Sequence, residues 1–170
     1  MPELPRLRRG TPHDRDGLVA LQHDAYETNR PLLGGTPAPL TWDYGVVLMR
    51  DEVWLAESGG LTLGALVLEH RDDCTYVASI AVRPAARGRG VGALLLALAE
   101  RRASALRRPA VRLIANARLA FNVDWYARSG YAIERVETVG ERRRVHMVKP
   151  IGSFPATTSP TTSALGGAET

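Results

Sequence analysis

A glycine-rich segment with two arginines is the strongest chemical signal in the sequence. It reads Arg87-Gly88-Arg89-Gly90-Val91-Gly92 and lies between a strand pattern and a helix pattern. Its glycines let backbone N–H groups approach an anion without obstruction by Cβ atoms. A helix start adds unpaired N–H donors and the positive end of the helix dipole. The segment therefore predicts a binding site for a phosphate or pyrophosphate.

The glycine spacing separates this segment from two common nucleotide-binding motifs. It is G-x-G-x-G rather than the G-x-G-x-x-G of a dinucleotide fold, and the sequence has no G-x-x-x-x-G-K-[ST]. The alternative is a glycine-rich turn that only lets a helix pack close to a strand. A strand before it, a helix after it and two arginines within it favour the anion site.

Strand and helix patterns alternate around this segment. The strands are expected at residues 4–9, 53–57, 61–70, 75–82, 111–115, 131–138 and 142–149. The helices are expected from Thr11 onward and at residues 41–49, 91–106 and 119–128. This order predicts an α/β fold, with a mixed central sheet of about seven strands flanked by helices.

Several side chains are expected to share a face within these elements. Leu18, Leu21, Gln22 and Ala25 give the first helix an apolar side, and Thr41 is the expected cap of the second. The helix at 91–106 is expected to present one face made of Leu94, Leu95, Leu98, Arg102 and Ala105. In the strand at 75–82, simple alternation places on one face Tyr76, Ala78, Ile80 and Val82.

The composition sets the domain organisation. A chain of 170 residues suits one domain, expected at residues 1–150. In residues 151–170, Gly, Ser, Thr, Pro and Ala supply 16 of 20 positions, which predicts a disordered C-terminal tail.

Composition also excludes several classes of function. The single cysteine, Cys74, excludes an internal disulfide and a cysteine-built zinc site, and the four histidines lack metal-ligand spacing. The net charge is +4, but acidic residues interleave with the arginines and no nucleic-acid motif is present, so we expect no nucleic-acid partner. No apolar run approaches the ~20 residues that span a bilayer, so we expect a cytoplasmic protein with no membrane partner.

Two motifs together resemble a known family. Arg87-x-x-Gly90-x-Gly92 is similar to the [QR]-x-x-G-x-[GA] signature of the GNAT N-acetyltransferase superfamily. Asn122-x-x-x-Tyr126-x-x-x-Gly130-Tyr131 resembles that family's second motif, and the resemblance extends from about Leu4 to Lys149. It implies a GNAT fold, with two parallel strands that splay at the cofactor cleft. It also implies transfer of an acetyl group from acetyl-CoA to an amine of a small molecule or protein, without a metal; a homodimer is compatible with it.

The resemblance also implies roles for individual residues. Backbone groups of Ile80, Ala81 and Val82 would pair with pantetheine, and an N–H near Val82 would face the acetyl carbonyl. The pyrophosphate would lie against Arg87, Gly88, Arg89, Gly90, Val91 and Gly92. Tyr126 would protonate the leaving thiolate; its alternative role is an aromatic packed beside Trp125. Asn122 would contact the cofactor or the tyrosine, and its alternative is a helix cap or a polar surface residue. Asn116 is a further candidate for a polar contact near the cofactor.

The sequence offers several candidates for the base that would deprotonate the amine. Related sequences often carry a glutamate on the strand before the signature, where this sequence has Ala78. Ser79 or a water would then relay the proton to Glu69, His70 or Asp43. On the acceptor side, the resemblance points to residues 29–49 and the Gly140 turn, with three aromatic residues that either line a pocket or belong to the core: Trp42, Tyr44 and Trp54.

The missing strand carboxylate supports a second hypothesis. A non-catalytic acyl-CoA-binding regulatory module would need the glycine-rich segment but neither a base nor Tyr126. Consumption of the thioester distinguishes this module from the enzyme.

Overall fold

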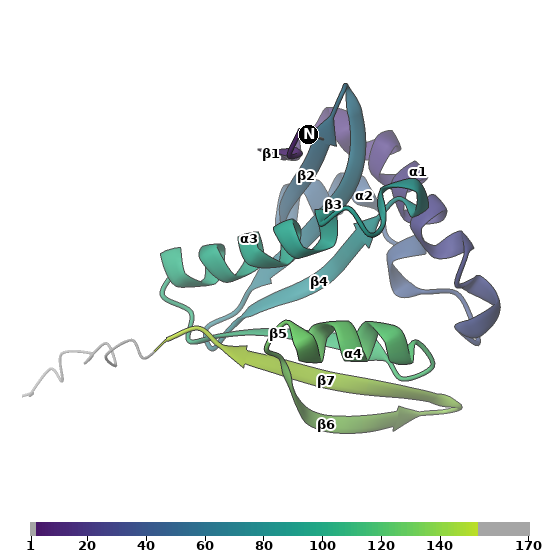
Figure 1. The fold of residues 1–170 in the computed structure, drawn as a ribbon, viewed down its shortest axis with the longest axis vertical. Helices are drawn as coiled ribbons and strands as arrows, with labels where there is room; N and C mark the ends of the chain where they lie inside the picture. The colour runs from purple at the N-terminus through teal and green to yellow at the C-terminus, as the bar shows by residue number, and fades with distance from the viewer. Residues whose placement is uncertain (1–2, 153–170) are drawn as a thin grey trace, which may run out of the picture.

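The computed structural model describes residues 3–152 and forms a split, seven-stranded sheet between two pairs of helices (Figure 1). The strand order is β1-β2-β3-β4-β5-β7-β6. Strands β4 and β5 pair in parallel, and the other neighbouring strands of this sheet pair antiparallel. The strands are β1 (Arg6–Arg9), β2 (Glu52–Ser58), β3 (Leu61–His70), β4 (Thr75–Val82), β5 (Ala110–Asn116), β6 (Ala132–Val139) and β7 (Arg142–Pro150). The helices are α1 (Arg15–Glu27), α2 (Tyr44–Arg50), α3 (Val91–Ala105) and α4 (Ala120–Arg128). The expected α/β class and mixed sheet are confirmed.

Short 3₁₀ turns connect several of these elements. They are Pro12–Asp14, Arg30–Leu32, Ala38–Leu40 and Pro84–Ala86. The first begins the helical region after Thr11, as expected. The second helix starts later than expected, because its cap is Asp43, whose carboxylate accepts a hydrogen bond from the Gly45 N–H at 2.9 Å. Thr41 instead donates to the Ala38 carbonyl.

The two faces of the sheet carry separate cores. On one face, α1 and α2 bury Leu18, Leu21 and Ala25 against Val67 and Ala81. On the other face, α3 and α4 cover a core made of both halves of the sheet, including Leu66, Leu95, Leu113, Tyr126 and Met147. The buried residues of α3 are Val91, Leu95, Leu96, Leu98, Ala99 and Ala103. Leu94 is only half-buried and Ala105 is exposed, so the buried face is shifted from the expected one.

A β-bulge in β4 changes which side chains share a face. Val67 pairs with Ser79 and Leu68 with Val77, which leaves Ala78 as the extra residue. Ala78 packs with the α1–α2 core, whereas Ile80 and Val82 pack with the α3–α4 core. The expectation of one face for Tyr76, Ala78, Ile80 and Val82 was therefore wrong, because alternation is interrupted at the bulge.

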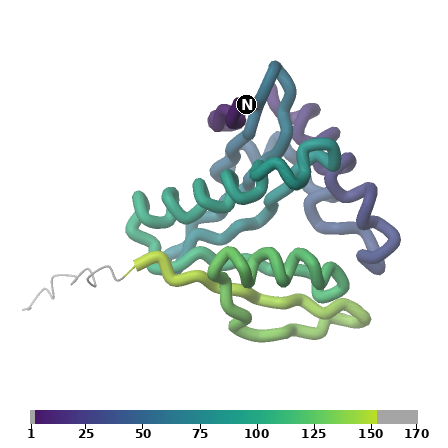
Figure 2. Tube along the Cα trace, in the orientation of Figure 1, coloured from purple at the N-terminus to yellow at the C-terminus, as the bar shows by residue number. Residues whose placement is uncertain are grey.

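The sheet divides at its parallel pair. β4 and β5 are paired only from Thr75–Val77 to Val111–Leu113, and beyond these residues the strands separate. Figure 2 follows the division along the trace: the chain as far as α3 forms the upper arm, and the chain from β5 onward forms the lower arm. The separation places the end of β4, the start of α3 and the side of α4 around one opening. The tail expected at 151–170 lies, from residue 153 onward, outside the described residues.

Candidate active site

The glycine-rich segment forms an open turn at the start of α3. Gly88 and Gly90 have left-handed φ angles of +72° and +80°, and Gly90 is the N-cap of α3. A Cβ atom at either position would meet no atom within 4 Å, so the backbone here faces open space. The conformation requires glycine, and the first-turn N–H groups have no intrahelical acceptor. The turn therefore presents unpaired donors at the positive end of a 15-residue helix.

The two arginines of this segment behave differently. Arg87 lines the cleft and donates to the Ala25 carbonyl near the end of α1, so it connects the turn to the opposite wall. Arg89 is exposed and is not among the residues that line the cleft. Gly88, Gly90, Val91 and Gly92 do line it. The structure thus brings together all of the segment except Arg89.

The end of β4 has one edge without a strand partner. Ile80, Ala81 and Val82 pair with β3 on their other edge, whereas the pairing with β5 stops at Val77. Backbone groups of an unpaired edge need other hydrogen-bond partners. An extended, amide-containing ligand can supply them, and the three residues line the cleft directly before the open turn.

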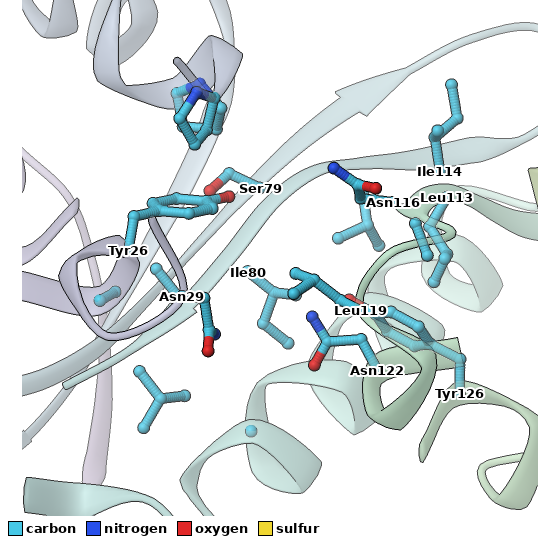
Figure 3. A pocket seen from close by; sticks show the side chains of 18 of the residues that line it. Tyr26, Asn29, Ser79, Ile80, Leu113, Ile114, Asn116, Leu119, Asn122 and Tyr126 are labelled. Carbon is cyan, nitrogen blue, oxygen red and sulfur yellow. The ribbon is translucent and has the colours of Figure 1, made fainter. Parts of the chain in front are cut away.

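The cleft has a volume of about 960 Å³, within the range of small-molecule sites. Figure 3 shows Tyr26 and Ser79 on one side, Asn122 and Tyr126 on the other, and Ile80 between them. The first pair belongs to α1 and β4, and the second pair to α4. The cleft therefore passes between the separated arms of the sheet.

Tyr126 lines the cleft and is also firmly packed. It is 8% exposed, and its ring centroid lies 4.8 Å from that of Trp125 and 6.0 Å, edge-on, from that of Tyr131. Burial, with a smaller contribution from the nearby Tyr26, raises the pKa of the Tyr126 hydroxyl above its ordinary value. The phenol therefore stays protonated at neutral pH and can donate a proton or a hydrogen bond.

Two asparagines line the cleft from the lower arm. Asn116, at the end of β5, accepts a hydrogen bond from the Arg118 N–H at 3.0 Å and so stabilises the turn into α4. Asn122 lies in the first turns of α4, and its side chain has no hydrogen-bond partner within residues 3–152. The Asn122 amide and the Asn116 Nδ2 group, both without a partner within residues 3–152, are thus available to a ligand.

The opposite wall contains a residue that sequence reasoning did not select. Tyr26 on α1 is half-buried, lines the cleft, and has a pKa raised by burial to about 12. Its position one residue after buried Ala25 was the only local signal. Of the three aromatic residues considered for the acceptor side, Trp42 lines the cleft. Tyr44 is in the α1–α2 core and donates to the Pro39 carbonyl at 2.9 Å, and Trp54 packs on the α3 side of the sheet.

The candidates for proton removal are widely separated. Ser79 lines the cleft, and its hydroxyl accepts a hydrogen bond from the Gln22 amide at 3.1 Å. Glu69 also lines the cleft and is ion-paired with Arg71 at 2.9 Å. His70 points to the other face of the sheet, toward Glu52, and Asp43 caps α2. Of the three carboxylate and imidazole candidates, the structure places only Glu69 at the cleft.

Residues 3–152 contain no group of three or more His, Cys, Asp or Glu side chains arranged to hold a metal ion. None of the helices in this part of the chain is long and apolar enough to cross a membrane.

The fold, with its split seven-stranded sheet and flanking helices, matches that of solved GNAT acetyltransferases. The chain aligns with the PaiA N-acetyltransferase from Thermoplasma acidophilum, solved with coenzyme A, at a TM-score of 0.74 and 14% identity over 85% of this chain and 98% of that one. A GCN5-related N-acetyltransferase from Rhodopseudomonas palustris aligns with a TM-score of 0.74 and 22% identity over 88% and 98%. A ribosomal-protein-alanine N-acetyltransferase from Brucella melitensis aligns with a TM-score of 0.69 and 21% identity over 85% and 99%.

The sequence itself gives the family. Residues 49–133 match the family model described as acetyltransferase (GNAT) domain, and the chain belongs to this family. A comparison with curated proteins gave no match. The resemblance inferred from the two motifs is confirmed, and so is the GNAT fold.

Proposed function

We propose that the protein transfers an acetyl group from acetyl-CoA to the nitrogen of an amine. One observation carries the proposal: the unpaired edge of β4 leads directly into the open turn at the start of α3. An acyl-CoA combines an amide-rich arm with a pyrophosphate, and these two features suit the edge and the turn in that order. Membership of the GNAT family supports the same donor.

The residues of this chain divide the binding of the donor between them. Ile80, Ala81 and Val82 would hold the pantetheine arm through their backbone groups. The first-turn N–H groups from Val91 onward would bind the pyrophosphate, with the left-handed turn at Gly88 and Gly90 keeping the approach open. Asn122, which has no partner within residues 3–152, would contact the donor from α4.

The chemistry requires one nucleophile and two proton transfers. The neutral amine nitrogen attacks the thioester carbonyl; a C–N bond forms and the C–S bond breaks. The proton lost by the nitrogen would pass, through Ser79 or a water, to Glu69, the carboxylate that lines the cleft. A backbone N–H near Val82 would stabilise the oxyanion that develops on the carbonyl. Tyr126, whose phenol is protonated at neutral pH, would supply the proton taken up by the thiolate.

An acyl-CoA-binding regulatory module remains the second candidate, because β4 carries Ala78 where a base is expected. Release of free CoA thiol, measured with a panel of amines, distinguishes the two. Acceptor-dependent thiol release with a matching acetylated product, observed by mass spectrometry, supports the enzyme. Tight acetyl-CoA binding by calorimetry, with no thiol release beyond the rate without protein, would support the module.

A further inference from the structure

The acceptor side of the cleft is lined by cationic residues, and this side lies away from the proposed phosphate site. Three consecutive arginines at the start of β7, residues 142–144, line the cleft together with Arg71. Glu69 is the only carboxylate among the lining residues of the described chain, and its charge is already paired with Arg71. The acceptor side therefore has an excess of positive charge.

The sheet separates these arginines from the α3 turn. Val145 and Met147 belong to the α3–α4 core, so the alternating residues Arg142 and Arg144 lie on the other face of β7. The open turn and Tyr126 belong to the α3–α4 side. A pyrophosphate bound at the start of α3 would therefore not neutralise Arg142 and Arg144.

Contacts within the structure hold the guanidinium groups of Arg142 and Arg71 at the cleft. Arg142 packs so closely over Gly35 that a Cβ there would lie 1.7 Å from its Nη2 atom. Arg144 is exposed on β7 and lines the same cleft as Tyr76. Arg71 lies over the Tyr76 ring at 4.0 Å from its centroid. No carboxylate in residues 3–152 forms an ion pair with Arg142 within 4.0 Å.

The segment between α1 and α2 restricts the size of the acceptor. Its Gly34 and Gly35 pack against Arg118 and Arg142, on the opposite arm of the sheet. Both glycines have positive φ angles, of +65° and +151°, so this close passage of backbone over guanidinium depends on the absence of side chains. The mouth of the cleft is thereby bridged, which favours a small molecule over a folded protein surface.

We propose that the acceptor is a small amine with an anionic group, a carboxylate or a phosphate, that Arg142 and Arg144 bind. This inference rests on the proposed function. Guanidinium groups bind both anions through paired N–H donors. The same positive charges disfavour the ammonium form of the acceptor. They therefore increase the fraction of neutral, reactive amine in a site whose strand β4 has no base. Polyamines are expected to be poor substrates.

Matched acceptors test the proposal and separate the two anions. Glycine is compared with glycinamide, and phosphoethanolamine with ethanolamine, with spermidine as the cationic amine. CoA release gives kcat/KM, which is expressed per concentration of neutral amine, because the anionic group itself raises the pKa of the amine. We expect the anionic member of at least one pair to be favoured by tenfold or more, and the pair that responds identifies the anion. A preference for the neutral or cationic amine throughout would overturn the proposal.

A binding measurement decides the matter even if none of these acceptors is turned over. Inorganic phosphate and, in a separate titration, acetate are added to the CoA-saturated protein while arginine Nε–H signals are followed by NMR. The double variant Arg142→Gln/Arg144→Gln should weaken binding of at least one of the two anions at least tenfold, whereas Arg101→Gln, which removes an exposed charge on α3, should change it less than twofold. Affinities for both anions that are equal in the double variant and the wild type would overturn the proposal.

An incorrect donor and an incorrect acceptor class give different results. If acetyl-CoA is not the donor, calorimetry should show no acetyl-CoA binding to the unmodified protein. An incorrect acceptor class would leave that binding intact, and the double variant would retain the wild-type selectivity among amines.

Discussion

The Arg102 guanidinium on α3 donates hydrogen bonds to both carboxylate oxygens of Glu52 on β2, at 2.6 and 3.1 Å. Glu52 is 9% exposed and also accepts hydrogen bonds from Trp54 and His70. The cluster lies on the face of the sheet covered by α3, away from Ser79 and the α1 wall of the cleft. It therefore connects a helix to the sheet and takes no part in the proposed chemistry.

Glu52→Gln should destabilise the fold without affecting donor binding. The substitution removes the buried charge opposite Arg102 and replaces one acceptor oxygen with a donor. Breaking a fully buried pair costs about 3–5 kcal/mol, and since the Arg102 side chain is 31% exposed we expect about 1–3 kcal/mol in urea unfolding. The exposed Glu141→Gln is the control and should change the unfolding free energy by less than ~0.5 kcal/mol.

The same cluster predicts how stability depends on pH. Burial pushes the pKa of Glu52 upward, but hydrogen bonds from Arg102, Trp54 and His70 outweigh it and lower the pKa to about 2. In the unfolded chain it is near ~4.3, so Glu52 stabilises the fold above that pH and the contribution is lost as the pH falls through about 2. The stability gap between wild type and Glu52→Gln should narrow from pH 5 to pH 2; a constant gap would contradict the prediction.

Local pattern identified most elements because each has a strong signal within a few residues. β3 and β4 have the predicted bounds, and α3 and α4 differ from them by one residue. The bulge at Ala78 was not predicted, because Thr75–Val82 is an apolar run in which either alternating set of residues could face a core. Only the pairing with β3 determines where alternation is interrupted.

Some residues of the cleft could be predicted from the sequence and others could not. Gly90 and Tyr126 lie within motifs of contiguous sequence, so the sequence alone selected them. Tyr26 and Arg144 carry no such motif. They reach the cleft only because α1 packs on β3 and β4 and the strand order places β7 beside β5. Long-range topology of this kind has no local signature.

A truncation tests the predicted domain boundary. The composition of residues 153–170 offers little apolar surface to bury, so removing them should change the unfolding free energy by less than ~0.5 kcal/mol. Stopping after Gly152 retains Ile151, whose N–H donates to the Pro109 carbonyl at 2.9 Å. A fall in melting temperature of several degrees would show that the removed segment contributes to the fold.

A charge placed at Gly90 tests the donor site. Asn and Asp have similar size and similar tolerance of the left-handed conformation that Gly90 adopts at φ +80°, so they differ mainly in charge. Gly90→Asp should weaken CoA binding by at least tenfold more than Gly90→Asn, because it places a carboxylate beside the pyrophosphate. Calorimetry gives both affinities, and equal losses would mean that no anion binds at this turn.

Two neighbouring tyrosines allow the catalytic acid to be tested against its packing role. Tyr126 lines the cleft; Tyr131 packs edge-on against it at 6.0 Å but directs its hydroxyl to Glu100, outside the cleft. Tyr126→Phe keeps the ring and removes the proton donor. If Tyr126 protonates the thiolate, kcat should fall by up to ~10²-fold, with little change in KM for acetyl-CoA, since the lost interaction belongs to the transition state.

Tyr131→Phe is the matched control, because it removes a hydroxyl from the same aromatic cluster without altering the cleft. It should leave kcat within about twofold. If the ring of Tyr126 acts only in packing, Tyr126→Phe should also leave kcat within about twofold. Tyr126→Ala should then lower the free energy of unfolding by about 3–5 kcal/mol through the lost aromatic volume. Steady-state kinetics on the two Phe variants and urea unfolding of Tyr126→Ala separate these cases. Wild-type turnover in Tyr126→Phe would remove the acid from the proposed mechanism while leaving the donor site at β4 and α3 in place.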